Sequence, residues 1–252
     1  MTIDFPAAGQ LPALRQLWQQ AFGDTDAFLD SFFATGFSPD CCRCITENSQ
    51  LAAALYWFDC KYRGNPVAYL YAIATDEAFR GRGLCHALME NTHTHLASLG
   101  YAGAILVPAE KSLFGFYARM GYQNFSSILE FPCSAGERAE TLRRIPAEEY
   151  ARLRRALLPG DAVIQEGAAL AFLDTYAAFY AGEALLLAAV PDGDNVFVPE
   201  LLGDPGKAPG IVTALGKKTG IFRTPGEGQP FAMYRSFTGE PAPTGYFALA
   251  LD

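Results

Sequence analysis

The turn Arg80-Gly81-Arg82-Gly83 has the residue types that suit binding of a diphosphate group. It follows an apolar run, residues 69–74, that predicts a β-strand, and it opens a predicted helix that continues to about Leu99. The glycines let the main chain come close to a ligand, and the first amides of a helix have no partner within it. The arginines add charge-assisted hydrogen bonds to phosphate oxygens. Alone, this string fits an exposed basic turn that caps a helix equally well.

A tyrosine further along the chain could supply a proton. Residues 102–107 predict a second buried strand, and residues 113–120 predict a short helix that ends before Gly121, a residue type common just after helices. Tyr117 lies in this helix, and a phenol can protonate a departing thiolate. The alternative role for Tyr117 is that of a helix residue whose ring packs into the core.

Both segments together resemble the GNAT superfamily of N-acetyltransferases. The family's acyl-CoA motif is Arg/Gln-x-x-Gly-x-Gly/Ala, and a later element is Tyr-x-x-x-Gly-aromatic. The matching residues are Arg80, Gly83 and Cys85 for the first motif and Tyr117, Gly121 and Tyr122 for the second. Cys85 replaces the usual Gly or Ala and is small enough for that position. The resemblance covers residues 45–131.

The resemblance implies an acyltransferase that uses acetyl-CoA as cosubstrate. The acetyl group would pass directly to a primary amine of a small molecule or peptide, with Tyr117 as the general acid and no covalent acyl-enzyme. The strand before the turn, the turn itself and the start of the helix would contact the cofactor. These residues are Ile73, Ala74, Thr75, Arg80, Gly81, Arg82, Gly83, Leu84, Cys85 and His86.

The general base is less clearly marked than the acid. Leu70 stands where many family members have a carboxylate on the strand before the turn. Glu110 is our predicted base, with Asp59, Tyr71 and bulk water as alternatives. The missing carboxylate leaves a second function open, that of a non-catalytic acyl-CoA-binding sensor or scaffold. The presence of Tyr117 favours the transferase.

Net charge, cysteine spacing and the apolar pattern disfavour several classes of partner. A formal net charge of −8 over 252 residues disfavours nucleic-acid binding, and with it peptidyl transfer from an aminoacyl-tRNA on a similar tandem fold. Cys41, Cys42 and Cys44 lack zinc-site spacing, so we expect reduced thiols and no metal. Without a leader pattern or a long apolar run, we expect a cytoplasmic protein with no membrane partner.

The order of predicted elements indicates an α+β protein with a mixed sheet, which the resemblance makes a GNAT fold. Helices at 11–22 and 26–33 precede strands at 41–46 and 51–59. We expect a GNAT domain at 1–133, a linker at 134–144 and a second domain at 145–252. The second domain loosely repeats the order of elements, ending in strands at 231–236 and 246–251, without an Arg-x-x-Gly-x-Gly turn. It resembles a degenerate GNAT-like half of a tandem protein, which would close the pocket or mediate association as a homodimer.

Overall fold

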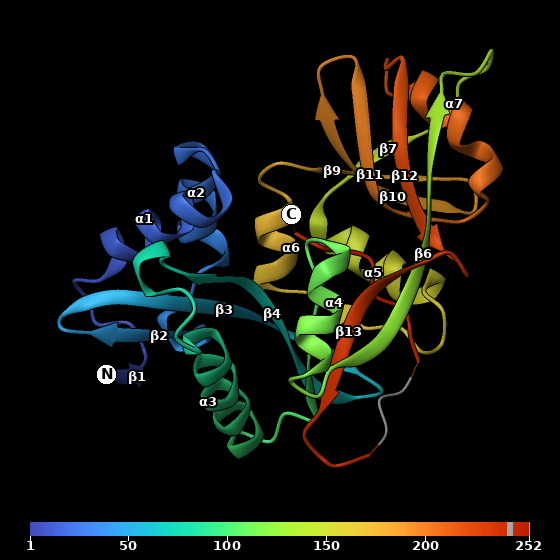
Figure 1. Cartoon of the computed structure of the whole chain (residues 1–252). Helices are drawn as coiled ribbons and strands as arrows, with labels where there is room; N and C mark the ends of the chain where they lie inside the picture. Colours follow the sequence, from blue (N-terminus) through green and yellow to red (C-terminus); the bar gives the residue numbers. More distant parts are fainter. Residues whose placement is uncertain (241–243, 252) are drawn as a thin grey trace.

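The computed structural model describes residues 1–240 and 244–251, and its first unit contains both helices and strands (Figure 1). A short strand and two helices come first, and the second helix continues into a π-helical turn at Phe32–Gly36. The elements are β1 (Thr2–Asp4), α1 (Leu11–Phe22), α2 (Asp26–Ser31), β2 (Cys42–Glu47), β3 (Gln50–Tyr62), β4 (Asn65–Thr75), α3 (Leu84–Ser98), β5 (Gly103–Leu106), α4 (Lys111–Ala118) and β6 (Gln123–Ser134).

The second unit has shorter helices and a compact group of strands. Its elements are β7 (Arg143–Ile145), α5 (Ala147–Leu157), β8 (Ile164–Gln165), α6 (Ala168–Leu173), β9 (Ala178–Gly182), β10 (Leu185–Asp192), β11 (Asn195–Leu202), α7 (Ala208–Ala214), β12 (Thr219–Pro225) and β13 (Gln229–Ser236). The expected linker, 134–144, therefore begins with the last residue of β6 and ends within β7.

One mixed sheet joins both units. Its strands lie in the order β1-β2-β3-β4-β5-β13-β6-β12-β11-β10-β9-β7, and β8 pairs with β3 beside this path. Among the described strands only β4 with β5 and β11 with β12 are parallel neighbours. In Figure 1 the long strand β6 runs from the first unit into the second. The mixed sheet confirms the expected α+β class.

Strand β13 returns to the first unit after the chain has built the second. Met233 lies opposite Leu106 of β5, and the other edge of β13 pairs with β6. We expected a strand at 231–236, but as part of the second domain. A Cβ at Gly103 would overlap the ring of Tyr234, so glycine at this position permits the close approach of β13 to β5. The first sheet region is thus completed by residues more than a hundred positions away.

The second unit repeats the strand topology of the first. Its neighbours β7-β9-β10-β11-β12 end in a parallel pair, as the neighbours β1-β2-β3-β4-β5 do. Along the chain, helices α5 and α6 lie between β7 and β9, and α7 lies between β11 and β12. This topology supports, as a proposal, the expected degenerate GNAT-like second half.

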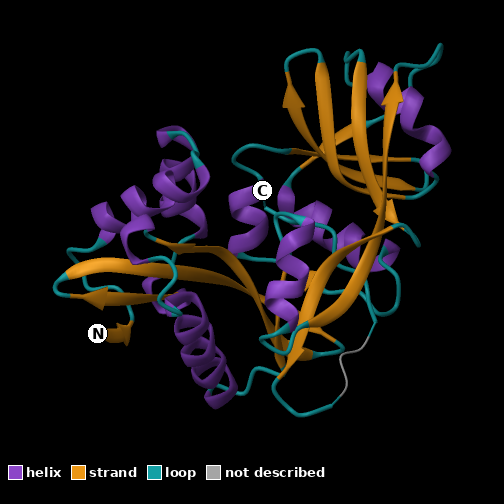
Figure 2. Cartoon of the chain, in the orientation of Figure 1, coloured by secondary structure: helices purple, strands orange, loops and turns teal. Residues whose placement is uncertain are grey.

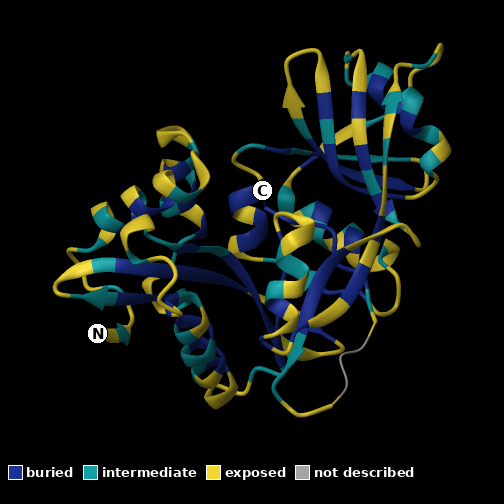
Figure 3. Ribbon diagram, in the orientation of Figure 1, coloured by how far each residue is buried: buried dark blue, intermediate teal, exposed yellow. Residues whose placement is uncertain are grey.

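Helices cover the two faces of β3 and β4 separately. Helices α1 and α2 lie on one side, and α3 lies on the other (Figure 2). Leu14 and Trp18 of α1 pack with one core cluster, whereas Leu88 and Leu96 of α3 pack with a second. Much of β3 and β4 is buried between these layers (Figure 3). The strand pair is therefore an interior element, as its apolar sequence predicts.

The chain from Tyr246 to Leu251 lies buried against the first cluster. We expected a strand here, but the segment forms only an isolated bridge, between Ala162 and Tyr246. Side chains hold it instead: Ser126 donates to the carbonyl of Phe247 at 3.0 Å, and Gln165 donates to that of Leu249 at 2.7 Å. The segment links the two units because Ser126 is on β6 and Gln165 is on β8.

A buried ion pair fastens α5 to β11. Arg154 and Glu200 are 1% and 0% exposed, and the guanidinium donates to both carboxylate oxygens, at 2.6 and 2.9 Å. The Tyr150 hydroxyl donates to the same carboxylate at 2.7 Å, and Arg154 also donates to the carbonyl of Val163 at 3.4 Å. This geometry satisfies much of the hydrogen-bonding capacity of two charges that burial would otherwise penalise.

Removing one partner of this pair should destabilise the protein strongly. Glu200→Leu leaves the Arg154 charge buried and uncompensated, so we expect the free energy of unfolding to fall by roughly 3–5 kcal/mol. Denaturant unfolding measures this change. The double variant Arg154→Met/Glu200→Leu should recover most of the loss. A double variant as unstable as the single one would show that packing, rather than the stranded charge, accounts for the effect.

Candidate active site

Strands β4 and β5 pair over a short distance and then separate. Their register runs only from Val67 with Gly103 to Tyr69 with Ile105. Beyond Tyr69, β4 contains a bulge, because two residues, Ala72 and Ile73, stand opposite one residue of β3. Ala72 has a φ of +47°, which is unusual for a residue with a side chain. The bulge bends β4 and leaves one edge of its last residues without a β5 partner.

A cavity of about 370 Å³ lies in this gap. Some lining residues, among them Trp18 and Tyr71, belong to the core cluster on the α1 and α2 face of the sheet. Others, among them Leu106 and Tyr117, belong to the cluster on the α3 face. The cavity therefore borders on both faces of the sheet through the opening between two strands.

The glycine turn leads from β4 into α3. Gly81 and Gly83 both have a φ of +75°, and a Cβ at either position would meet no atom within 4 Å. The first amide of α3 with a partner within the helix is that of Ala87, which donates to Gly83 at 3.1 Å. The preceding amides, those of Leu84, Cys85 and His86, therefore form the positive end of the helix. Open space at this end fits a phosphate group.

The two arginines of the turn are held by the protein itself. Arg80 donates to the carbonyl of Thr75 at 3.2 Å and pairs with Glu77 at 3.4 Å. Arg82 pairs with Glu47 at 2.7 Å and lies over the Phe79 ring at 5.4 Å. Both side chains are about half exposed. A phosphate bound at the turn would lie close to both guanidinium groups. It would compete for them with the carboxylates of Glu77 and Glu47.

Tyr117 lies at the cavity on the α3 side. Its side chain is 8% exposed, and its carbonyl accepts from the amides of Met120 and Tyr122, which fixes the end of α4. Burial, and secondarily the nearby Cys85, raise the pKa of the Tyr117 hydroxyl. Burial also raises the pKa of Cys85, to about 11. Tyr117 therefore keeps its proton at neutral pH, as a general acid must.

Residues 3–125 match the family model described as "Acetyltransferase (GNAT) domain". The N-terminal half of the chain belongs to the GNAT acetyltransferase family. No curated protein matches the sequence significantly.

Solved structures extend the likeness in fold beyond the GNAT domain. A GCN5-related N-acetyltransferase from Kribbella flavida is 18% identical with a TM-score of 0.70, over 93% of this chain and 70% of that one. Eis1 from Mycobacterium abscessus is 13% identical with a TM-score of 0.69, over 94% and 74%. A GCN5-related N-acetyltransferase from Anabaena variabilis is 14% identical with a TM-score of 0.68, over 93% and 72%. At these identities the likeness concerns the fold, and it includes the second unit.

A chain of polar contacts extends from β13 to Tyr122, whose ring packs against Tyr117 of the GNAT domain. Arg235 of β13 donates to Nδ1 of His93 at 2.8 Å, and Nε2 of His93 lies 2.7 Å from the hydroxyl of Tyr122. Because arginine can only donate, the proton of neutral His93 is on Nε2 and is donated to Tyr122. The Tyr122 ring packs edge-on against that of Tyr117, with centroids 6.0 Å apart. Arg235 also binds both carboxylate oxygens of Glu90.

The candidate bases lie in different places. Glu110 is exposed, accepts a hydrogen bond from Ser112, and lines a neighbouring cavity of about 430 Å³ with Lys111 and Arg223. Tyr71 lines the same cavity as Tyr117, and its hydroxyl donates to the carbonyl of Leu251 at 2.5 Å. The structure thus brings Tyr71, but not Glu110, into the cavity of Tyr117.

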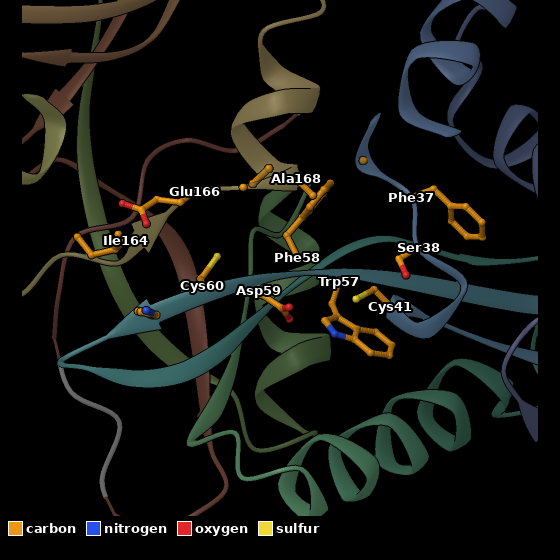
Figure 4. A pocket seen from close by; sticks show the side chains of 14 residues that line it. Phe37, Ser38, Cys41, Trp57, Phe58, Asp59, Cys60, Ile164, Glu166 and Ala168 are labelled. Carbon is orange, nitrogen blue, oxygen red and sulfur yellow. The ribbon is translucent and has the colours of Figure 1, made fainter. Parts of the chain in front are cut away.

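Asp59 faces a third cavity, of about 320 Å³, between β3 and the segment at the start of α6. In Figure 4 Cys41, Trp57 and Asp59 lie on one side of this cavity, and Ile164 and Glu166 lie on the other. Asp59 accepts a hydrogen bond from Tyr101 at 2.5 Å. This cavity is separate from that of Tyr117.

Several residues at the site were not found from the sequence. Trp18, Asp24 and Phe28 come from α1, α2 and the connection between them, and they line the cavity with Tyr117. Arg235 comes from the last strand. The only available signal was the apolar stripe of α1, which indicated a buried face without indicating what it covers.

No group of three or more His, Cys, Asp or Glu side chains in the described residues could hold a metal ion. No described helix has the length and hydropathy of a membrane span.

His93 should make the stability of the GNAT domain depend on pH. Burial and the Arg235 charge lower its pKa from 6.5 to about 4. Between these values the unfolded chain binds a proton that the native protein does not, so stability should fall as pH drops, by up to about 1.4 kcal/mol per pH unit.

Urea unfolding at pH 7 and pH 5, above the range where most carboxylates titrate, measures this slope. The matched variant is His93→Gln, whose amide can accept from Arg235 and donate to Tyr122 without titrating. It should lose less stability than the wild type over this interval. Equal slopes for both proteins would show that His93 does not contribute the effect.

Proposed function

We propose that the protein transfers an acetyl group from acetyl-CoA to a primary amine, by direct attack of the amine on the thioester. The observation that carries this proposal is the cavity in the gap between β4 and β5, which borders on both faces of the sheet. A thioester in that gap is open to attack from one face while its sulfur lies towards the other. Membership of the GNAT family supports the acyltransferase class.

The glycine turn and the bulged strand supply the binding site for the cosubstrate. The pyrophosphate would accept from the free amides at the start of α3, with space above Gly81 and Gly83 and with Arg80 and Arg82 beside it. The unpaired edge of β4 at Ile73, Ala74 and Thr75 would offer main-chain groups to the pantetheine arm. The same arrangement supports the predicted contacts of Leu84, Cys85 and His86.

Tyr117 would act as the general acid in the transfer. The amine nitrogen forms a bond to the carbonyl carbon, the carbon–sulfur bond breaks, and the sulfur receives the Tyr117 proton. The nitrogen loses one proton, which restores the phenol directly or through water. A buried phenol with a raised pKa remains protonated until this step. For Glu110 to serve as the base, the amine would have to reach it past Val107 and Ala109, the residues that both cavities share.

The second unit would complete the pocket rather than bind a second cosubstrate. Phe172 of α6 packs edge-on against Phe28, a residue of the cavity wall, with centroids 5.2 Å apart. In the buried segment 246–251, the carbonyl of Leu251 accepts a hydrogen bond from the Tyr71 hydroxyl. Both contacts support the role of the second half as a wall of the acceptor side.

Substitution at the turn tests where acetyl-CoA binds. Gly83→Glu places bulk and negative charge at the proposed pyrophosphate site, and its φ of +75° disfavours any side chain. We expect calorimetric titration to show acetyl-CoA binding in the wild type and no binding in the variant. Gly83→Ala is the matched control, since it shares the backbone strain without the charge, and it should keep part of the affinity. Tight binding by Gly83→Glu would place the cosubstrate elsewhere.

Substitution of the acid tests the mechanism. Tyr117→Phe removes one hydroxyl and keeps the ring contact with Tyr122. Turnover should fall by roughly 10²–10⁴, with the affinity for acetyl-CoA nearly unchanged. Steady-state release of CoA thiol measures turnover. Unchanged turnover would remove Tyr117 from the mechanism. Acetyl-CoA binding without transfer to any amine would instead favour the alternative, a non-catalytic acyl-CoA-binding protein.

A further inference from the structure

The wall of the cavity on the α1 and α2 side is aromatic. Five rings contribute to the lining here, and they come from two helices and from β4: Trp18, Phe22, Phe28, Tyr69 and Tyr71. Aromatic faces attract cations and also accept apolar groups. A ligand on this side of the sheet would therefore be bound chiefly through ring and hydrocarbon contacts.

One charge stands in this aromatic wall. Among the described residues that line the cavity, Asp24 alone carries a formal charge. It is half-buried, and the indole nitrogen of Trp18 donates to its Oδ2 at 2.7 Å. A carboxylate accepts several hydrogen bonds, so this one leaves capacity for a ligand. The cavity thus offers a single anionic group.

The position of Asp24 is fixed by the packing of its partner. Trp18 is 2% exposed, and its ring centroid lies 4.5 Å from that of Phe32 and 5.2 Å from that of Tyr56. The tightly packed indole of Trp18 holds the carboxylate in place through one hydrogen bond, to Oδ2. A preorganised carboxylate selects a ligand with less loss of conformational entropy than a mobile one does.

Resting on the proposed acetyl transfer, we propose that the acceptor is a hydrophobic monoamine, a primary ammonium on an aromatic or apolar body, and that Asp24 is the residue that selects it. One carboxylate neutralises one ammonium. A polyamine would place a second ammonium in a lining whose described residues offer no second carboxylate, so ring contacts alone would have to offset its desolvation. The carboxylate of an amino acid would face Asp24 and find no cation among the described lining residues.

The location suits the transfer. Trp18, Tyr69 and Tyr71 belong to the core cluster on one face of the sheet, and Tyr117 belongs to the cluster on the other. An amine held near Asp24 therefore reaches the gap from the face opposite the proposed acid. The ammonium is the bound form. It loses one proton to bulk water, and the neutral amine then attacks the carbonyl carbon.

Calorimetric titration with three amines, in the presence of desulfo-CoA, tests the acceptor class. The probes are 2-phenylethylamine, phenylalanine, which adds a carboxylate, and spermidine, which adds positive charges. We expect 2-phenylethylamine to bind at least tenfold more tightly than either of the others. Equal or tighter binding of phenylalanine or spermidine, or no binding of 2-phenylethylamine, would overturn the inference.

Two variants test the residues. Asp24→Asn keeps an oxygen for the Trp18 indole and removes the charge, so 2-phenylethylamine should bind at least tenfold more weakly. Asp26→Asn is the matched control, because Asp26 is an exposed carboxylate two positions away that does not line the cavity, and binding should stay within twofold of the wild type. Phe22→Leu alters a half-exposed ring and should also weaken binding. An Asp24→Asn variant that binds like the wild type would overturn the inference.

Acetyl transfer to the same amines separates this inference from the proposed function. Transfer to spermidine in preference to 2-phenylethylamine would leave the transferase standing and overturn the acceptor class. Binding of 2-phenylethylamine that depends on Asp24, without any acetyl transfer, would support the site and contradict the proposed transferase.

Discussion

The separation of β4 from β5 is the constraint on which the site depends. A strand inside a sheet normally pairs along both edges, and an unpaired main-chain edge must find other partners. Here the bulge at Ala72 and Ile73 turns β4 away after only three paired residues. The resulting gap is the place where a cavity can border on both faces of the sheet at once. Tyr117 and Asp24 both line this cavity.

Strand β13 anchors one of the two strands that border this gap. Strand β13 pairs with β5 on the side away from β4, so β5 is anchored although it has only four residues. The same strand carries Arg235, whose contacts with Glu90 and His93 connect it to α3. The helix that follows the glycine turn is thus fastened to β13, and the ring contact of Tyr122 with Tyr117 links this cluster to α4. In the sequence, β13 comes after all the other strands and helices of the second unit.

The second unit contacts the first through packed side chains and through ion pairs, among them Arg63 with Asp161 and Arg223 with Glu130. Its buried Arg154–Glu200 pair fixes α5 on β11, and Arg154 also contacts the carbonyl of Val163, close to the buried end of the chain. That end passes between the units and reaches Tyr71. This unit repeats the strand order of the first without the glycine turn, which supports its proposed role as a wall of the pocket. The likeness in fold to larger acetyltransferases extends over this unit as well.

The local pattern of the sequence was enough for the strand at 69–74, the glycine turn, the helix after it and the place of Tyr117. These features depend on neighbours a few positions apart: alternation, capping and the freedom of glycine at positive φ. Only the tertiary structure decided that β13 completes the first unit, that Arg235 fixes the tautomer of His93, and that Glu110 and Tyr117 line different cavities. The aromatic wall with Asp24 likewise unites a helix, a connection and a strand. Such contacts join residues far apart in the chain, and the free energy of packing that selects them leaves no short-range pattern in the sequence.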